Sequence, residues 1–440
     1  MLVAPLAVPS VTVAYAVKTG SKNEDPAEAG VSHFLEHFVF KGTKKYPSSK
    51  EVMRAMDSIG AEHNAGTGKE STTYWVKTAA DNLSKAVEMI GELVCRPLLP
   101  ENLLNQEKGT ILQEMAMIED HPMSRIWEKF EALIFGPSTA LGRDKIGTKE
   151  TISGMKVKQL MDYRLRRYRP DNSVFVVAGG VKPEEVVRLA EKEFALAAAT
   201  VFSRVAGRRV PLSGHPIRPF PVNSNIGATD VQFPRKKIAV ANLRTVEFRR
   251  TDQVHLEMGR KAFGRQDPRR YALSLLMTVL GGNASSRLFQ IVREKMGLAY
   301  YVHSGSTRYE EDGYVAISAG VAPDKAAKAE SEILKIVRGL KVSTSELSEA
   351  KGYALGHLAL AWEESDFIAG HLADDFLFEN SVRSRREIEK IFKKVSLAEV
   401  NSLSDWLFGD NQPLSLAAIG PVSSSLEVKG KNQIPNSKLQ

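Results

Sequence analysis

The sequence contains very little cysteine and no long hydrophobic run. Cys95 is the only cysteine among 440 residues, which excludes both an internal disulfide and a zinc site built from cysteines. No stretch approaches the roughly 20 apolar residues of a membrane-spanning helix. The first residues, MLVAPLAVPSVTVAYAVKTGS, have no basic segment, and prolines interrupt their apolar run. We therefore expect a cytoplasmic protein without a signal peptide or a membrane span.

The positive charge of the chain is spread along the sequence. The formal net charge is +8, from 60 Lys and Arg against 52 Asp and Glu. Apart from short clusters such as Arg164–Arg169, the basic residues are dispersed and are not interleaved with aromatic residues. A nucleic-acid-binding protein is the reading that the charge alone suggests, but a binding surface for DNA or RNA needs a basic stripe. We expect no nucleic-acid partner.

What the sequence does contain is an internal repeat. Asp25-Pro26 precedes an apolar run that predicts a helix as far as Phe40, and Asp267-Pro268 precedes a similar run 242 positions later. Asp before Pro is a typical helix start. In each half a predicted strand lies before this helix, and a strand that contains a tyrosine lies after it. A period this long indicates two similar domains.

The repeat defines the predicted domain organisation. Glu107-Lys108-Gly109 and Ala350-Lys351-Gly352 provide a further match, at an offset of 243. Strands and helices are mixed without regular alternation, so we predict an α+β protein of two homologous domains, each a largely antiparallel sheet with packed helices. The predicted parts are a catalytic domain (1–205), a linker (206–240), a second domain without a metal site (241–424) and a flexible tail (425–440).

Three ionisable side chains share one face of the first predicted helix. His33, Glu36 and His37 occur within the apolar segment VSHFLEHFVFKGT. Residues separated by three or four positions lie on the same side of a helix. A core helix with a few polar residues is the simpler explanation. Two imidazoles one turn apart also suit a zinc ion, and H-x-x-E-H is a zinc peptidase signature.

A catalytic zinc site needs a third protein ligand and an open position for water. The helix predicted from Glu101 carries Glu107 and Glu114, which are two turns apart on one face. At least one of them is expected to point inward, and Glu114 completes a His-His-Glu set.

The second half serves as an internal control for this hypothesis. The positions that correspond to the two histidines and to Glu36 are Leu275, Val279 and Thr278, and those that correspond to the two glutamates are Ala350 and His357. The helical pattern persists while the chemistry is lost. This contrast favours a metal site over a purely structural role.

Taken together, three motifs resemble a known family. The segments HFLEHFVFKGT, EHNAGTGKESTTYW and QEKGTILQEM are similar to those of the pitrilysin and mitochondrial-processing-peptidase superfamily of inverted zincins. The 77 positions between His37 and Glu114 are typical of these enzymes. The resemblance extends over both halves and indicates a short, two-domain member.

The resemblance implies roles for individual residues. It implies that His33, His37 and Glu114 bind one Zn²⁺ per chain, that Glu36 is the catalytic base, and that Glu107 helps to hold the site.

The resemblance also implies residues that contact the substrate. In the second half, VREKMGLAYYV resembles the substrate-binding pair of the family, here Arg293 and Tyr300, and Tyr300 is also expected to stabilise the oxyanion. Asn64 and Ala65 correspond to an edge strand that pairs with substrate, although Gly66 stands where relatives often have an aromatic residue. His63 is interpreted as a strand residue, because the zinc site needs no fourth protein ligand.

The implied function is a zinc-dependent endopeptidase that hydrolyses peptides or extended, unfolded polypeptide segments. The family also implies a dimer, either of two identical chains or with a related partner. The alternative is a non-catalytic scaffold or partner subunit of such a heterodimer.

Overall fold

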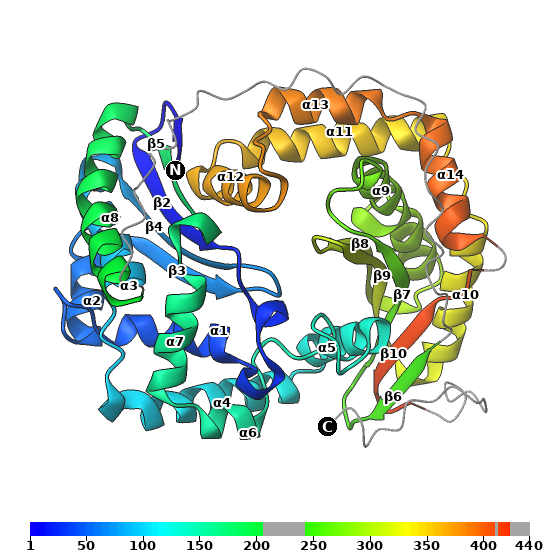
Figure 1. Ribbon diagram of the computed structural model, residues 1–440. Coiled ribbons are helices and arrows are strands. Elements are labelled where there is room, and N and C mark those ends of the chain that lie inside the picture. Colours follow the sequence, from blue (N-terminus) through cyan, green and yellow to red (C-terminus); the bar gives the residue numbers. More distant parts are fainter. Residues whose placement is uncertain (206–242, 410–411, 423–440) are drawn as a thin grey trace.

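Two five-stranded sheets with equivalent strand order organise the chain (Figure 1). This computed structural model describes residues 1–205, 243–409 and 412–422. The order is β1-β5-β2-β4-β3 in the first sheet and β6-β10-β7-β9-β8 in the second, so every strand of one sheet has a counterpart in the other. The strands are β1 (Leu2–Pro5), β2 (Ser10–Val17), β3 (Glu62–Thr67), β4 (Thr72–Ala79), β5 (Ser173–Gly179), β6 (Arg244–Phe248), β7 (Val254–Phe263), β8 (Ala299–Arg308), β9 (Asp312–Val321) and β10 (Ser415–Gly420).

Both sheets are largely antiparallel. Only the pairs β1–β5 and β6–β10 are parallel, and the other neighbouring strands are antiparallel. The predicted α+β class and the internal repeat are thus confirmed. The sheets fall within the predicted domains 1–205 and 241–424, whereas the linker 206–240 and the tail 425–440 lie outside the described residues, so the exact boundaries stay predictions.

Helices pack around each sheet. In the first unit they are α1 (Val31–Phe38), α2 (Ser49–Asp57), α3 (Leu83–Cys95), α4 (Leu104–Asp120), α5 (Pro122–Phe135), α6 (Lys149–Gly154), α7 (Val157–Arg167) and α8 (Pro183–Val205). In the second they are α9 (Arg270–Met277), α10 (Ala326–Arg338), α11 (Thr344–Ala361), α12 (Ser365–Glu379), α13 (Arg385–Lys394) and α14 (Leu397–Phe408). Within the part of the chain that the structure describes, no helix combines the length and the apolar character required to cross a membrane.

The helix that carries the histidines begins later than predicted. Asp25 caps a short 3-10 turn over Pro26–Glu28, and α1 starts only at Val31. The break lies at Gly30, whose φ of 87° is left-handed and whose missing Cβ would be 2.1 Å from a backbone oxygen of Ile146. The buried carboxylate of Glu24 accepts the N–H groups of Gly30 at 2.7 Å and Ser32 at 2.8 Å. These bonds satisfy donors at the start of α1 and hold its first turn in place.

Each unit lends one helix to the sheet of the other. Figure 1 shows α12 against the first sheet and α5 against the second. The cluster around α12 joins its Ile368 and Leu372 to Ala14 and Val176 of the first sheet. The hydroxyl groups of Ser365 and Thr12 also bond at 2.8 Å. Because a helix from the second half covers this apolar face of the first sheet, the first unit depends on the second for the burial of its sheet.

The reverse contact is made by α5. Ile126 and Phe130 of this helix pack with Ala316 and Ala417 of the second sheet. The ring of Phe130 meets that of Tyr314 edge to face, with centroids 5.6 Å apart. This contact places the end of α4, which immediately precedes α5, close to the second unit.

Replacing Phe130 by alanine tests the energy of this contact. Phe130 is 1% exposed, so we expect the free energy of unfolding to fall by about 3–5 kcal/mol in urea titrations. The matched control is Trp127→Ala on the same helix, where the ring is 42% exposed and the expected loss is less than about 1 kcal/mol. Equal losses in the two variants would contradict the packing of α5 described above.

Candidate metal centre

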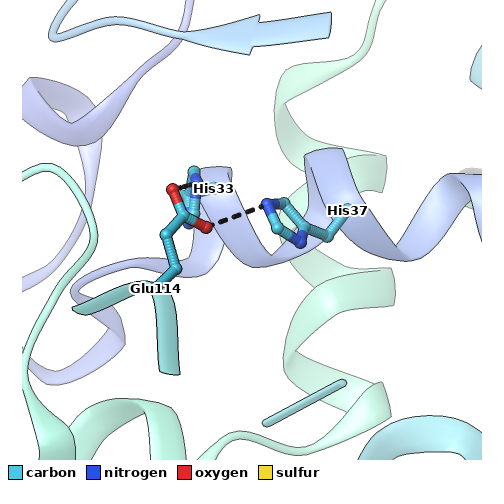
Figure 2. Close-up of side chains that lie close together, drawn as sticks. All are labelled: His33, His37 and Glu114. Atoms are coloured by element: carbon cyan, nitrogen blue, oxygen red, sulfur yellow. Dashed lines mark ion pairs between the residues drawn. The ribbon is translucent and has the colours of Figure 1, made fainter. Parts of the chain in front are cut away.

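Two helices bring three potential metal ligands together. His33 and His37 project from the same face of α1, and Glu114 reaches them from α4 (Figure 2). The ligand atoms of the three side chains all lie within 4.8 Å of one another. His33 is buried, while His37 and Glu114 are half-buried. The group is the one that the sequence predicted.

The distances within this group suit a shared metal ion. His33 Nε2 lies 3.5 Å from Glu114 Oε1, and His37 Nε2 lies 3.4 Å from Glu114 Oε2. Both exceed the usual length of a nitrogen–oxygen hydrogen bond, about 2.7–3.2 Å. Ligands at zinc bond lengths of about 2.0–2.1 Å in tetrahedral geometry are about 3.3 Å apart. The donor set and its spacing therefore fit Zn²⁺.

Glu107 holds the second histidine from behind. Its carboxylate oxygen Oε1 is 3.0 Å from His37 Nδ1, and Oε2 is 2.6 Å from Lys41 Nζ. A neutral His37 that donates from Nδ1 to Glu107 presents its other ring nitrogen, Nε2, toward Glu114. Carboxylate partners of this kind orient metal-binding histidines and raise their basicity. This arrangement agrees with the role predicted for Glu107, and it adds Lys41, for which the sequence analysis assigned no role.

The acidic partners change the protonation of the site. Burial lowers the pKa of His37, but Glu107 and Glu114 outweigh it and raise the value to about 9. The proximity of His33 and His37 lowers the pKa of the Glu114 carboxyl group well below its ordinary value. Burial raises the pKa of Glu107, and its contacts with His37 and Lys41 reverse that effect and lower it overall. Without a metal ion, therefore, a proton on His37 balances the charge of the glutamates.

Glu36 lies beside this group without joining it. The residue is half-buried on α1, one position before His37. Its carboxylate accepts a hydrogen bond from the hydroxyl of Thr67, at the end of β3. The charge of Glu36 also contributes to the raised pKa of His37, so its carboxylate lies near the ligand group. The base role itself stays a prediction, and sequence reasoning missed Thr67, although it occurs within one of the quoted motifs.

The predicted substrate-binding strand is at the edge of the first sheet. β3 pairs only with β4, so its other edge has no partner strand among the described residues. Asn64 is exposed and Ala65 is half-buried, and the N–H of Ala65 donates to the side-chain oxygen of Asn64 at 2.9 Å. His63 lies on the same strand with its ring near that of Phe40, outside the group of three ligands.

Arg293 and Tyr300 belong to the second unit. Arg293 lies in a helical turn (Phe289–Lys295), where it stacks over Phe289 and is 3.6 Å from Glu294. Tyr300 lies near the start of β8 and is 59% exposed. Neither side chain is part of the His33–His37–Glu114 group. Both are accessible, and their roles toward substrate stay predictions.

The second unit has no equivalent metal group among its described residues. Leu275, the counterpart of His33, is fully buried in the apolar core of the second unit. His357, the counterpart of Glu114, lies against Tyr353 of its own helix, with the two rings tilted and their centroids 4.2 Å apart. The contrast between the halves expected from the sequence is therefore present in the structure.

Replacing Glu107 by glutamine tests the electrostatics of the site. The substitution keeps the shape of the side chain but removes the charge, so the pKa of His37 in the metal-free protein should fall below its value of about 9. NMR titration of the ring signals measures this shift. Glu101→Gln, at an exposed position before α4, is the control and should leave the pKa of His37 unchanged. An unchanged pKa of His37 in the Glu107→Gln variant would show that Glu107 does not set the protonation of this histidine.

Comparisons with known proteins agree with this geometry. Residues 5–140 match the family model described as insulinase (peptidase family M16), and residues 154–352 match the model of the peptidase M16 inactive domain. An uncharacterized zinc protease of Mycobacterium leprae is 32% identical over 95% of this chain and 88% of its own length. Another, from Bacillus subtilis, is 30% identical over 93% of each chain.

Solved structures show the same fold. The crystal structure of a protease from Helicobacter pylori superposes with a TM-score of 0.80 at 22% identity and covers 95% of this chain and 96% of its own. The similarity in sequence to both relatives extends over nearly the whole of each protein. The chain therefore belongs to peptidase family M16, in the pitrilysin-like two-domain superfamily that its motifs resemble.

Proposed function

We propose that this protein is a zinc-dependent endopeptidase that hydrolyses peptides or extended, unfolded polypeptide segments. The observation that carries the proposal is the convergence of two imidazoles on one carboxylate, with each histidine nitrogen 3.4–3.5 Å from an oxygen of Glu114 and all ligand atoms within 4.8 Å of one another. The names of the relatives as zinc proteases support it.

His33, His37 and Glu114 would hold one Zn²⁺ per chain, and Glu107 would fix the ring of His37. When bound, zinc supplies a Lewis acid and lowers the pKa of a coordinated water molecule toward neutrality. Three protein ligands leave a position for that water, as in catalytic rather than structural zinc sites.

Glu36 acts as the general base in this proposal. Its carboxylate takes a proton from the attacking water and later gives it to the leaving amine. Thr67 occupies one carboxylate oxygen, so the other oxygen is the one that faces the water. The phenol of Tyr300 donates a hydrogen bond to the oxyanion that develops on the scissile carbonyl.

Substrate binds as an added strand in this proposal. The free edge of β3 at Asn64 and Ala65 offers main-chain groups to an extended peptide once the N–H of Ala65 exchanges its bond to the Asn64 side chain for one to the peptide. Such main-chain bonds do not depend on the peptide sequence. Arg293 contributes a further contact from the second unit. Folded proteins do not present a free strand, so peptides and unfolded segments are the preferred substrates.

The proposed setting is a cytoplasmic dimer. The chain carries both the ligand set and the Arg293–Tyr300 pair, which is compatible with a homodimer and with a heterodimer that includes a related chain. Neither nucleic acid nor a membrane is a proposed partner.

Replacing Glu36 by glutamine tests the catalytic proposal. The variant should retain stoichiometric zinc, because Glu36 is not among the ligands, but lose peptide hydrolysis by at least about 100-fold. Zinc content and cleavage of a peptide library, with and without a chelator, are the measurements. Wild-type protein that binds no stoichiometric zinc would instead support the alternative of a non-catalytic scaffold, and full activity of the variant would exclude Glu36 as the base.

The protonation of His37 leads to a second test. Because its pKa is raised to about 9, most His37 rings carry a proton near neutral pH, and this proton must leave when a metal binds. Zinc titration calorimetry in buffers of different ionisation enthalpy should therefore detect proton release near neutral pH that declines as the pH rises through about 9. The Glu107→Gln variant, with a lower pKa, should release fewer protons. Equal release by both proteins would contradict the proposed link between Glu107 and metal binding.

A further inference from the structure

The carboxylate of Glu36 is held by a residue from a different element. The hydroxyl of Thr67 donates to Glu36 Oε2, and in the described chain this is the only hydrogen bond to that carboxylate. Thr67 is buried, so water does not compete freely for its hydroxyl. Glutamate has three side-chain torsions, and a fixed contact at one oxygen restricts the direction of the other.

Thr67 is itself firmly placed. It is the last residue of β3 and pairs with Thr72, the first residue of β4. The two threonines use their hydroxyls differently, because Thr72 donates to the backbone oxygen of Thr19 at 2.9 Å. A branched Cβ also limits the rotamers of threonine in a strand. The hydroxyl of Thr67 therefore has a defined position relative to α1.

The turn between β3 and β4 is fixed at several points. Gly68 N bonds to Ser71 O at 2.8 Å across the turn, and the backbone of Ser21 and Lys22 donates to the oxygens of residues 68 and 69. The buried carboxylate of Glu70 accepts the ammonium group of Lys22 at 2.8 Å.

The carboxylate of Glu70 also contacts the second unit. Both oxygens of Glu70 accept the backbone N–H of Glu310 at 2.9 Å. Glu310 follows β8 in the turn before β9, and its own carboxylate is 2.6 Å from Lys18 Nζ in the first unit. Contacts from both units thus hold the turn between β3 and β4, which directly follows Thr67.

We propose that Thr67 is a positioning residue for Glu36. Its hydroxyl fixes one oxygen of the base, and the clamped hairpin keeps that hydroxyl in register with α1. The inference rests on the proposed peptidase function and adds to it a residue that acts through Glu36 rather than on the substrate. Small errors in the placement of a reacting group cost roughly ten- to hundredfold in rate, which sets the scale of the expected effect.

Three variants test this role. Thr67→Val removes the hydroxyl at nearly constant shape, Thr67→Ser keeps it, and Thr72→Val removes the paired hydroxyl that bonds elsewhere. We expect Thr67→Val to lower kcat for an internally quenched peptide by roughly ten- to hundredfold, with KM changed by less than about twofold. Its zinc content and Tm should match those of Thr72→Val. Thr67→Ser should recover most of the lost kcat, and Thr72→Val should keep kcat close to the wild-type value.

The outcomes separate this inference from the function on which it rests. Zinc-loaded wild-type protein that cleaves no peptide would overturn the proposed function. An active wild type together with an unchanged kcat in Thr67→Val would overturn only the positioning role. The role is also overturned if Thr67→Val loses zinc or Tm beyond the loss in Thr72→Val, because the hydroxyl would then be structural, or if KM alone changes, because it would then serve substrate binding.

Discussion

The contact between the carboxylate of Glu114 and two imidazoles joins α4 to α1, and the rest of the site depends on it. The histidines are neighbours through the helical repeat alone, since four positions make about one turn. Glu114 reaches them only because α4 packs across α1. Once that packing exists, a nitrogen of each imidazole lies 3.4–3.5 Å from an oxygen of the Glu114 carboxylate.

The charges of the site are balanced by a chain of contacts that runs from Lys41 through Glu107 to His37. Lys41 pairs with Glu107, which has almost no exposed side-chain surface, and Glu107 in turn contacts His37. A buried carboxylate without such partners would be costly. The lysine is outside the ligand group, yet its contact allows a charged glutamate to remain behind the histidine. In the second unit, Leu275 and Ala350 stand at the positions of His33 and Glu107, and both belong to an ordinary apolar core.

Local patterns predicted most of the site, and long-range packing explains what they missed. The spacing of His33, Glu36 and His37 depends only on helix geometry, and the repeat predicted both sheets correctly. The start of α1 was misplaced because Asp25 caps a 3-10 turn. The helix begins instead after a left-handed Gly30, which packs against the distant backbone of Ile146 and bonds to the neighbouring Glu24. Thr67 was missed because nothing in a strand pattern shows which carboxylate its hydroxyl will meet.

The resemblance supplied the roles of Arg293 and Tyr300, which their exposed positions in the second unit neither confirm nor contradict.

The exchange of α5 and α12 also was not visible in the sequence, since an apolar helix face does not identify the sheet it will cover. It has a consequence for how the protein is made. During synthesis, Ala14 and Val176 emerge from the ribosome well before Ile368 and Leu372, which cover them in the finished molecule. The first sheet therefore keeps an apolar face uncovered until the ribosome has also translated the residues of α12. Exposed surface of this kind promotes aggregation, so this interval is when the growing chain most needs protection by chaperones.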